Sequence, residues 1–357
     1  MGKLLYVLKR IKSMDKKAMI NAINVVHKKT GMSRLKIFND MRQCAVKYGA
    51  GYMDYNLFEM YNLTPEQRDT YLTRGRNNEL VVKYCDKSKL HAFMNKDEFN
   101  NIFNEYIKRD WLKVNDVSKE QIEEFTKNHG IFMLKPIDGG CGKGIEKINI
   151  ADYDNFDELY KYLSENGQNA ILEELIVQDS SVAKINPYSI NTVRVVTIVT
   201  TEDGKSLLEI PENKRKDVKL KSHIICAYFR IGNNKKCVDN FNSGGMVAPV
   251  DETTGIVSQV AIDKNKVTYI NHPETGSPIK GFKFPYWEQV LTMCKEASLK
   301  IPEMGYAGWD IAFTPNGPVI VEGNEFPGHD IYQLPEHTPD KIGMMEKFNF
   351  SKEKIKV

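Results

Sequence analysis

Apolar and polar residues follow helical spacing in the first part of the chain. In Lys16–Lys29 apolar side chains recur every three or four residues, which predicts an amphipathic helix. Gly31 interrupts this pattern, and Ser33 is a suitable N-cap for a second helix over Arg34–Tyr48. Thr64–Gln67 combines threonine, proline and glutamine as a capping box does at a helix start. The pattern predicts a mainly helical N-terminal region, residues 1–79.

The pattern changes to strands after about residue 80. A further capping box at Ser118–Gln121 opens a helix that ends near Gly130, and helices are also expected over Phe156–Leu163 and Phe284–Leu299. Strands are predicted at Ile131–Pro136, Ile145–Ile150, Ala170–Val177, Thr192–Thr201, Lys219–Ile231, Gly245–Pro249, Gly255–Ala261, Tyr306–Phe313 and Pro318–Gly323. Pro315-Asn316-Gly317 is a hairpin turn between the last two strands. The fold class is therefore α+β with mostly antiparallel sheets.

Composition narrows the class of protein. With 357 residues, 41% of them hydrophobic, the chain can bury a core and is long enough for about two domains. It contains no run of about 20 apolar residues, and Leu4–Leu8 is too short for a secretory signal. The six cysteines contain no CxxC pair and are typical of reduced thiols. We therefore expect a cytoplasmic protein without a membrane span.

Charge is unevenly distributed along the chain. Residues 1–47 hold twelve Lys or Arg against two acids, so the remainder is net acidic by seven charges. Apolar residues at helical spacing in the first fourteen positions leave two interpretations: a basic amphipathic helix that contacts a membrane surface or an anionic saccharide, or a helix that packs on the body. The basic segment has no interleaved aromatic residues, so we expect no nucleic-acid partner.

A glycine-rich loop lies between two of the predicted strands. Asp138–Gly144 holds four glycines in seven residues, and glycine allows backbone amides to approach phosphate oxygens closely. No GxxxxGK[ST] sequence and no following helix is present, so it is neither a Walker A loop nor a dinucleotide fingerprint. The loop therefore fits a flap over a triphosphate with Lys135 beside it, and the alternative is a flexible hairpin.

Polar residues interrupt the two last predicted strands. Asp310 lies in an apolar segment, and Glu322 and Asn324 are two residues apart, so they face the same side of a strand. Buried carboxylates are costly unless they are paired or bind a metal, and three oxygen ligands suit Mg²⁺. The alternative is a solvated face with chance acids.

Together, these motifs resemble the ATP-grasp superfamily. Lys135-Pro136 with the glycine loop, Ile171–Ile176, and Asp310 with Glu322-Gly323-Asn324 follow the order of its second lysine, phosphate loop, adenine hinge and Mg²⁺ ligands. Further segments resemble the sugar-transfer-associated ATP-grasp family over residues 80–335: Ile185–Arg194, Phe229–Gly232, Val238–Asn240, Ser243–Gly245 and Gly308–Asp310. The resemblance implies a small subdomain at 80–177 with its preceding linker, a C-terminal subdomain at 178–345 and a tail at 346–357.

The resemblance also implies ATP and Mg²⁺ as cofactors and a role for each candidate residue. The phosphate-binding lysines would be Lys135 and Lys87, with Lys83 and Lys89 as alternatives to Lys87. The nucleotide would further contact Gly139, Gly140, Gly142, Lys143, Gly144, Glu173, Glu174 and Ile176, and the metal would contact Asp310, Glu322 and Asn324. The catalytic candidates are Arg194, Arg230 and Asn240. A structural ion pair within the sheet is the alternative for Arg194.

The expected activity is that of a ligase. An ATP-grasp ligase activates a carboxylate as an acylphosphate, and the family name suggests an amino acid or another carboxylate joined to an amine or hydroxyl of a sugar or polysaccharide precursor. A kinase that phosphorylates a sugar or polyol, and a non-catalytic nucleotide-binding subunit, remain alternatives. The oligomeric state cannot be inferred from the sequence.

Overall fold

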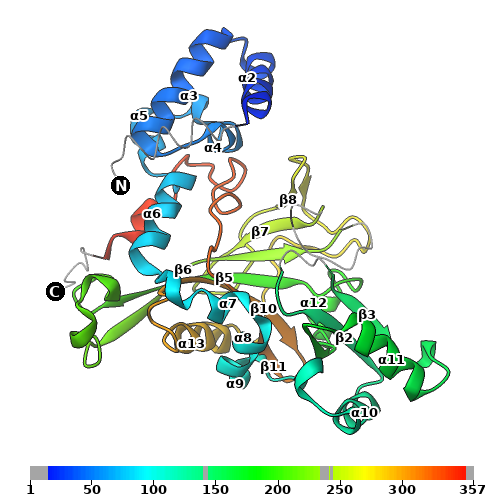
Figure 1. Ribbon diagram of the computed structural model, residues 1–357. Coiled ribbons are helices and arrows are strands. Elements are labelled where there is room, and N and C mark those ends of the chain that lie inside the picture. The colour runs from blue at the N-terminus through cyan, green and yellow to red at the C-terminus, as the bar shows by residue number, and fades with distance from the viewer. Residues whose placement is uncertain (1–14, 140–143, 234–240, 242–243, 351–357) are drawn as a thin grey trace. The chain divides into compact units, whose positions relative to one another are not determined.

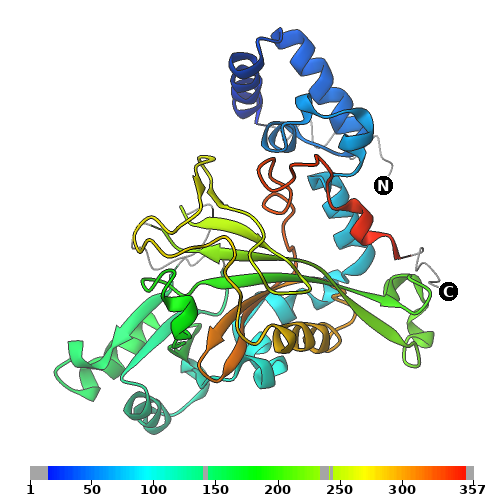
Figure 2. The same cartoon turned by 180° about the vertical axis from the view of Figure 1, so that it is seen from behind.

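The computed structural model describes residues 15–139, 144–233, 241 and 244–350 (Figures 1 and 2). Contacts divide the chain into two compact units. Unit 1 comprises residues 1–80 and 328–349, and unit 2 comprises 81–327 and 350–357. The subdomain boundaries expected at 177/178 and 345/346 remain predictions, and the expected helix in the first fourteen residues lies outside the described part of the chain.

Unit 1 is helical, as the apolar spacing predicts. Its helices are α2 Lys16–Thr30, α3 Arg34–Tyr48, α4 Tyr52–Leu57, α5 Pro65–Asp69 and the start of α6 Arg74–Tyr84. Ser33 caps α3 by accepting a hydrogen bond from the amide of Lys36, and Thr64 with Gln67 forms the expected capping box at α5. Apolar side chains of α2, α3 and α4 meet in a core that includes Val26, Ile37 and Tyr55.

The segment 328–349 completes unit 1 although it is distant in sequence. Gln333 is buried, and its side chain accepts from the amide of Leu72 (2.8 Å) and donates to the carbonyl of the same residue (2.9 Å). His329 is also buried, with Nε2 at 2.9 Å from Asp54 Oδ1. The helical region therefore does not consist of the N-terminal residues alone.

A four-stranded antiparallel sheet forms one part of unit 2. Its order is β1-β4-β2-β3, with β1 Trp111–Lys113, β2 Ile131–Pro136, β3 Glu146–Asn149 and β4 Ala170–Glu174. Helices α10 Lys119–Asn128 and α11 Phe156–Asn166 share a core with one face of the sheet, which includes Phe132, Leu134 and Leu172. Since strand residues alternate between faces, Lys135 and Glu173 project from the opposite face.

A seven-stranded antiparallel sheet forms the other part. Its order is β11-β10-β5-β6-β7-β8-β9. Its strands are β5 Thr192–Thr201, β6 Leu220–Ile231, β7 Met246–Val250, β8 Ala261–Asp263, β9 Thr268–Tyr269, β10 Tyr306–Thr314 and β11 Gly317–Asn324. The remaining helices are α7 His91–Met94, α8 Lys96–Ile102, α9 Asn104–Ile107, α12 Ser180–Ala183 and α13 Trp287–Ser298.

Aromatic packing fixes which face of this sheet is covered. The ring of Trp309 in β10 lies 5.5 Å from Phe93 and 5.2 Å from Phe103 between ring centres. The α7–α9 segment therefore covers the face to which Trp309 points. Asp310, the next residue of β10, projects from the other face.

The α+β class and the antiparallel pairing are confirmed, whereas several boundaries are wrong. The strand expected at Ala170–Val177 ends at Glu174, and the helix expected over Phe156–Leu163 continues to Asn166. The strand predicted at Gly255–Ala261 does not form before Ala261, because Ile256 and Val257 make single bridges to two different partners, Lys283 and Val250. The helix expected from Phe284 begins only at Trp287, since Tyr286 has a left-handed φ of 56°. No helix in the described residues is long and apolar enough to cross a membrane.

The packing on β11 leads to a stability prediction. A Cβ at Gly323 would lie 2.6 Å from Phe99 Cε2 and 2.8 Å from Phe93 Cδ1, both on the covered face. Because overpacking forces neighbouring side chains to shift, Gly323→Ala should lower the free energy of unfolding by about 1–3 kcal/mol. Urea unfolding measures this.

Gly130→Ala is the matched control, since its Cβ would meet nothing closer than Ile150 Cδ1 at 3.9 Å. An equal loss of unfolding free energy in the two variants would contradict close packing of α7 and α8 against β11.

Candidate functional site

The register of β5, β10 and β11 brings three predicted site residues together. Asp310 lies opposite Arg194 in β5 and opposite Glu322 in β11. Asn324 lies two residues beyond Glu322 on the same face, opposite Gly308. Arg230 on β6 also reaches this group, because its guanidinium contacts Asp310. The face of the large sheet opposite α7–α9 thus gathers two carboxylates, one amide and two guanidinium groups.

Asp310 is the centre of this cluster. Arg194 donates to it through Nε (2.7 Å to Oδ1) and Nη2 (2.8 Å to Oδ2), and Arg230 donates to Oδ2. Burial disfavours the charged form of Asp310, which is 2% exposed, but the two guanidinium groups outweigh it. They hold the pKa of this carboxyl well below its usual range, so Asp310 is ionised and its charge is balanced.

Glu322 lies in a different environment although it is opposite Asp310. The surrounding protein and the neighbouring Asp310 carboxylate raise the pKa of Glu322 to about 7. Its side chain nevertheless remains accessible from solvent, so a ligand can reach it. The Nδ2 atom of Asn324 is buried and has no hydrogen-bond partner among the described residues. These two side chains have the donor and acceptor capacity that a bound ligand would use.

A second charged cluster lies on the small sheet. The carboxylate of Glu173, only 2% exposed, contacts Lys135 Nζ and accepts from Arg109 Nη2 (2.9 Å) and Asn100 Nδ2 (3.2 Å). Burial disfavours its ionisation, but the two cations lower the pKa of Glu173 to about 2. The side chain of Glu173 is therefore committed to positioning Lys135 and Arg109.

Arg109 joins this cluster to the strand that carries Glu322. Its guanidinium is buried and donates to the carbonyl of Ile320 (2.7 Å) and to that of Val321 (3.1 Å), besides Glu173. One side chain thus connects β4 of the small sheet with β11 of the large sheet. Sequence reasoning did not identify Arg109, because it follows a short helix and belongs to no recognisable motif.

Lys96 is a second residue that the sequence analysis missed. Its Nζ donates to the carbonyls of Pro136 (2.8 Å) and Gly139 (2.9 Å), at the entry to the glycine loop. Burial lowers the pKa of this ammonium, while Glu322 favours its charged form. Lys96 thus lies near Glu322 and at the base of the loop. Its sequence context is an ordinary helix start, so no pattern marks it.

The other lysine candidates are exposed or have another partner. Lys87 and Lys89 are exposed at the ends of the 3-10 turn Lys87–Lys89, and Lys83 pairs with Glu209 at 3.3 Å. The assignment of Lys87 to a phosphate stays a prediction.

The glycine loop is described only at its ends. Gly139 and Gly144 have φ angles of 121° and 71°, which residues with a side chain rarely adopt. The predicted site residues Gly140, Gly142, Lys143 and Asn240 lie outside the described part of the chain. The two described ends have the backbone geometry that a tight glycine loop needs.

The predicted adenine hinge continues from β4. Glu174 ends the strand, and one of its carboxylate oxygens accepts from the amide of Asp110 at 3.0 Å. Ile176 follows in the extended segment before α12 and is half-buried. Its backbone contact with adenine stays a prediction.

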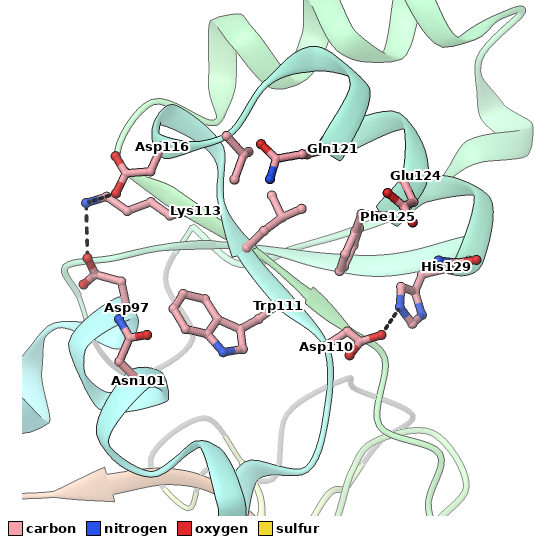
Figure 3. Close-up of a pocket in the computed structure, with 13 residues that line it drawn as sticks. Asp97, Asn101, Asp110, Trp111, Lys113, Asp116, Gln121, Glu124, Phe125 and His129 are labelled. Carbon is pink, nitrogen blue, oxygen red and sulfur yellow. Dashed lines mark hydrogen bonds and ion pairs between the residues drawn. The ribbon is translucent and has the colours of Figure 1, made fainter.

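A pocket of about 520 Å³ lies elsewhere, at the free edge of the small sheet beside β1 (Figure 3). Lys113 pairs there with Asp97 (3.2 Å) and Asp116 (3.1 Å), and Asp110 lies 3.0 Å from His129. Asp110, His129 and Glu174 place one ligand atom each within 4.8 Å of one another. This pocket lies outside the two charged clusters described above.

A comparison with models of protein families shows to which family the chain belongs. The model of the sugar-transfer-associated ATP-grasp family matches residues 75–340. The chain belongs to this family. The match contains both charged clusters and the glycine loop, so the sugar-transfer-associated ATP-grasp relationship inferred from the motifs is confirmed. No curated protein matches the chain.

Solved structures match the chain at low sequence identity and with TM-scores of 0.40 or less. The ATP-grasp ligase PsnB with a minimal precursor is 14% identical, with a TM-score of 0.37, and the match covers 68% of this chain and 56% of that one. D-alanine–D-alanine ligase from Bacillus anthracis is 14% identical (TM-score 0.37; 77% and 72% covered). D-alanyl-alanine synthetase A from Vibrio cholerae is 12% identical (TM-score 0.40; 77% and 69% covered). The chain thus spans little more than half the length of the PsnB structure.

The Glu173 cluster generates a prediction that depends on pH. Glu173→Gln leaves Lys135 and Arg109 without their carboxylate, and breaking a buried pair in this way costs about 3–5 kcal/mol. Because folding lowers the pKa of Glu173 from its ordinary 4.5 to about 2, its contribution is complete above pH 4.5 and is lost as the pH falls towards 2. Urea unfolding should show that the difference in free energy of unfolding between wild type and variant becomes smaller from pH 7 to pH 3.

Glu124→Gln, at an exposed position of α10, is the control and should unfold like the wild type at every pH. A gap between wild type and Glu173→Gln that stays constant across this range would contradict an ionised, buried Glu173.

Proposed function

We propose that the protein is an ATP-dependent ligase that joins a carboxylate to an amine or hydroxyl through an acylphosphate. The observation that carries this proposal is the charged cluster of the large sheet, where Asp310 and Glu322 lie opposite each other with Arg194 and Arg230 beside them. This arrangement supplies oxygen ligands for a cation and fixed positive charge for phosphoryl oxygens. Membership of an ATP-grasp family supports the same reading.

The residues present fit Mg²⁺ and ATP. Asp310, Glu322 and Asn324 offer the carboxylate and amide oxygens that Mg²⁺ prefers, and they project from one face of adjacent strands. Bound Mg²⁺ would neutralise charge on the phosphate oxygens during transfer. The glycine loop from Gly139 to Gly144 would cover the phosphates. The backbone from Glu173 to Ile176 would contact adenine.

Fixed cations would orient the triphosphate and the activated substrate. Lys135 and Lys96 project beside the loop entry, and each is held by protein oxygens in the structure. Arg194 and Arg230 are held by Asp310 in a geometry that leaves their positions defined before substrate arrives. Such preorganised charges stabilise a transferring phosphoryl group without reorganisation. Asn240 would line the same space.

The proposed reaction has two steps. A carboxylate oxygen of the substrate attacks the γ-phosphorus of ATP, and the bond to the leaving ADP breaks. The nitrogen or oxygen of the acceptor then attacks the carbonyl carbon of the acylphosphate, loses its proton and releases inorganic phosphate. Two arginines near the metal ligands suit a substrate that is itself an anion, which favours a ligase over a sugar kinase. The family name suggests a sugar or polysaccharide precursor as the acceptor, and an amino acid is our choice for the carboxylate.

Product analysis tests this proposal directly. The enzyme is incubated with ATP, Mg²⁺ and pairs of amino acids with amino sugars or sugar nucleotides, and the products are identified by mass spectrometry. A ligase forms ADP, inorganic phosphate and an amide or ester. Formation of ADP and a phosphoester would replace the ligase by a kinase. Nucleotide binding without turnover of any pair would favour the non-catalytic subunit.

Glu322→Gln tests the metal site. It removes ligand charge with almost no change in volume, so turnover should fall by at least about 100-fold, while thermal unfolding stays close to that of the wild type. The steady-state rate of ADP release measures the effect. Glu288→Gln, on the exposed side of α13, is the control and should keep full activity. Full activity in Glu322→Gln would remove this residue from the site.

Lys96→Met and Lys87→Met test which lysine contacts phosphate. A charge-assisted hydrogen bond contributes about 1.5–3 kcal/mol, so Lys96→Met should weaken binding of ADP with Mg²⁺ by about 10- to 100-fold. Titration calorimetry measures this, and circular dichroism checks that the fold is retained. Lys87→Met, at an exposed position, should bind nearly normally. The reverse ranking would assign the phosphate contact to Lys87.

A further inference from the structure

Helix α3 exposes apolar residues on the side that faces away from the core of unit 1. Ile37, Met41 and Cys44 point inward and are buried. Leu35 and Val46 lie on the opposite side of the helix, and each is 70% exposed. An amphipathic helix normally presents polar residues to solvent. The solvent side of α3 differs from this pattern, because it carries large apolar residues.

Positive charge predominates in α2 and α3. Helices α2 and α3 together contain eight Lys or Arg and one acid, Asp40. Arg68 holds Asp40 with two hydrogen bonds of 2.7 and 2.8 Å. The net charge of these two helices is therefore +7, and their one acid is already paired with Arg68. Residues 1–14 add four further cations and no acid in sequence.

We define a basic apolar face on α3 by Leu35, Lys36, Phe38, Arg42 and Val46. Arg34 lies at its border towards α2, where its Nε donates to Asn24 Oδ1 (2.8 Å). The face combines three exposed large apolar side chains, the third being Phe38 at 40% exposed, with two exposed cations on one helix. Exposed apolar residues in groups mark contact surfaces rather than ordinary solvated positions. The rest of the chain after residue 47 carries a net charge of −7, so attraction to an anionic partner is concentrated in this part of the sequence.

We propose that the basic apolar face binds the surface of a membrane that contains anionic lipids. Leu35, Phe38 and Val46 would enter the boundary between headgroups and acyl chains, and Arg34, Lys36 and Arg42 would lie at the level of the lipid phosphates. Interfacial helices combine an apolar insertion surface with basic residues in this way. A soluble anionic saccharide would engage the cations alone and would gain nothing from exposed leucine and valine.

The experiment is sedimentation of the full chain with vesicles. Vesicles of phosphatidylcholine with phosphatidylglycerol are compared with vesicles of phosphatidylcholine alone, at 0.1 M and at 1 M salt. We expect binding to the anionic vesicles, weakened at high salt because the Debye length falls from about 10 Å to about 3 Å. Absence of binding to anionic vesicles at 0.1 M salt would overturn the proposal.

Charge variants locate the contact. Each Lys or Arg near an anionic surface contributes about 1 kcal/mol, so the triple variant Arg34→Gln, Lys36→Gln, Arg42→Gln should bind anionic vesicles about 100-fold more weakly. The control replaces Lys214, Lys216 and Lys219 by Gln, three exposed cations of unit 2 in a similarly short segment. Equal losses in both variants would indicate unspecific attraction and overturn the assignment to α3.

Apolar variants separate a lipid surface from a soluble polyanion. Leu35→Ser with Val46→Ser should reduce vesicle binding by at least about tenfold but leave binding to dextran sulfate unchanged, because only the lipid accepts these side chains. The control, Val177→Ser with Ile270→Ser, alters side chains of similar exposure, 67% and 65%, in unit 2. Circular dichroism verifies the fold of each variant. Unchanged vesicle binding by the α3 variant would overturn insertion and leave a purely electrostatic contact.

Discussion

The buried carboxylate of Glu173 is the interaction on which the arrangement of unit 2 depends. Burying an ionised carboxylate away from water raises the free energy of the folded state. Lys135, Arg109 and the amide of Asn100 offset this cost by their contacts with Glu173. The consequence is geometric, since Lys135 is fixed on the small sheet while Arg109 extends to the carbonyls of β11. The two sheets therefore share one electrostatic centre, and the strand that carries Glu322 is positioned from it.

The carboxylates of the large sheet follow a different principle. Asp310 is neutralised by Arg194 and Arg230, whereas burial and the Asp310 carboxylate outweigh the attraction of the same two arginines at Glu322, so that its pKa rises. Two acids at directly opposed positions of neighbouring strands thus differ in charge state because of their neighbours. A divalent cation would resolve the repulsion between them, which is the physical link between this register and the proposed nucleotide chemistry.

Local patterns predicted most of this fold. The bounds of β2, β5 and α3 agree residue by residue with their apolar patterns and caps. The strand predicted at Gly255–Ala261 does not form, because a strand needs one neighbouring strand along its length. Which segment will be that neighbour cannot be inferred from the local sequence. Lys96 and Arg109 were missed for a related reason, since a lysine at a helix start or an arginine after a short helix acquires its role only through distant carbonyl groups. The functional assignments of the described site residues remain proposals, because proximity shows a site and not a reaction.

The division of unit 1 between both ends of the chain has a consequence during synthesis. Residues 1–80 are synthesised before the buried partners of Leu72 and Asp54, namely Gln333 and His329, which follow only after residues 81–327. At about 5–20 residues per second this interval is on the order of tens of seconds. During this interval the surface of the first helices that residues 328–349 later cover remains exposed. The segment 1–80 can then be bound by chaperones or cut by proteases at sites that residues 328–349 later cover.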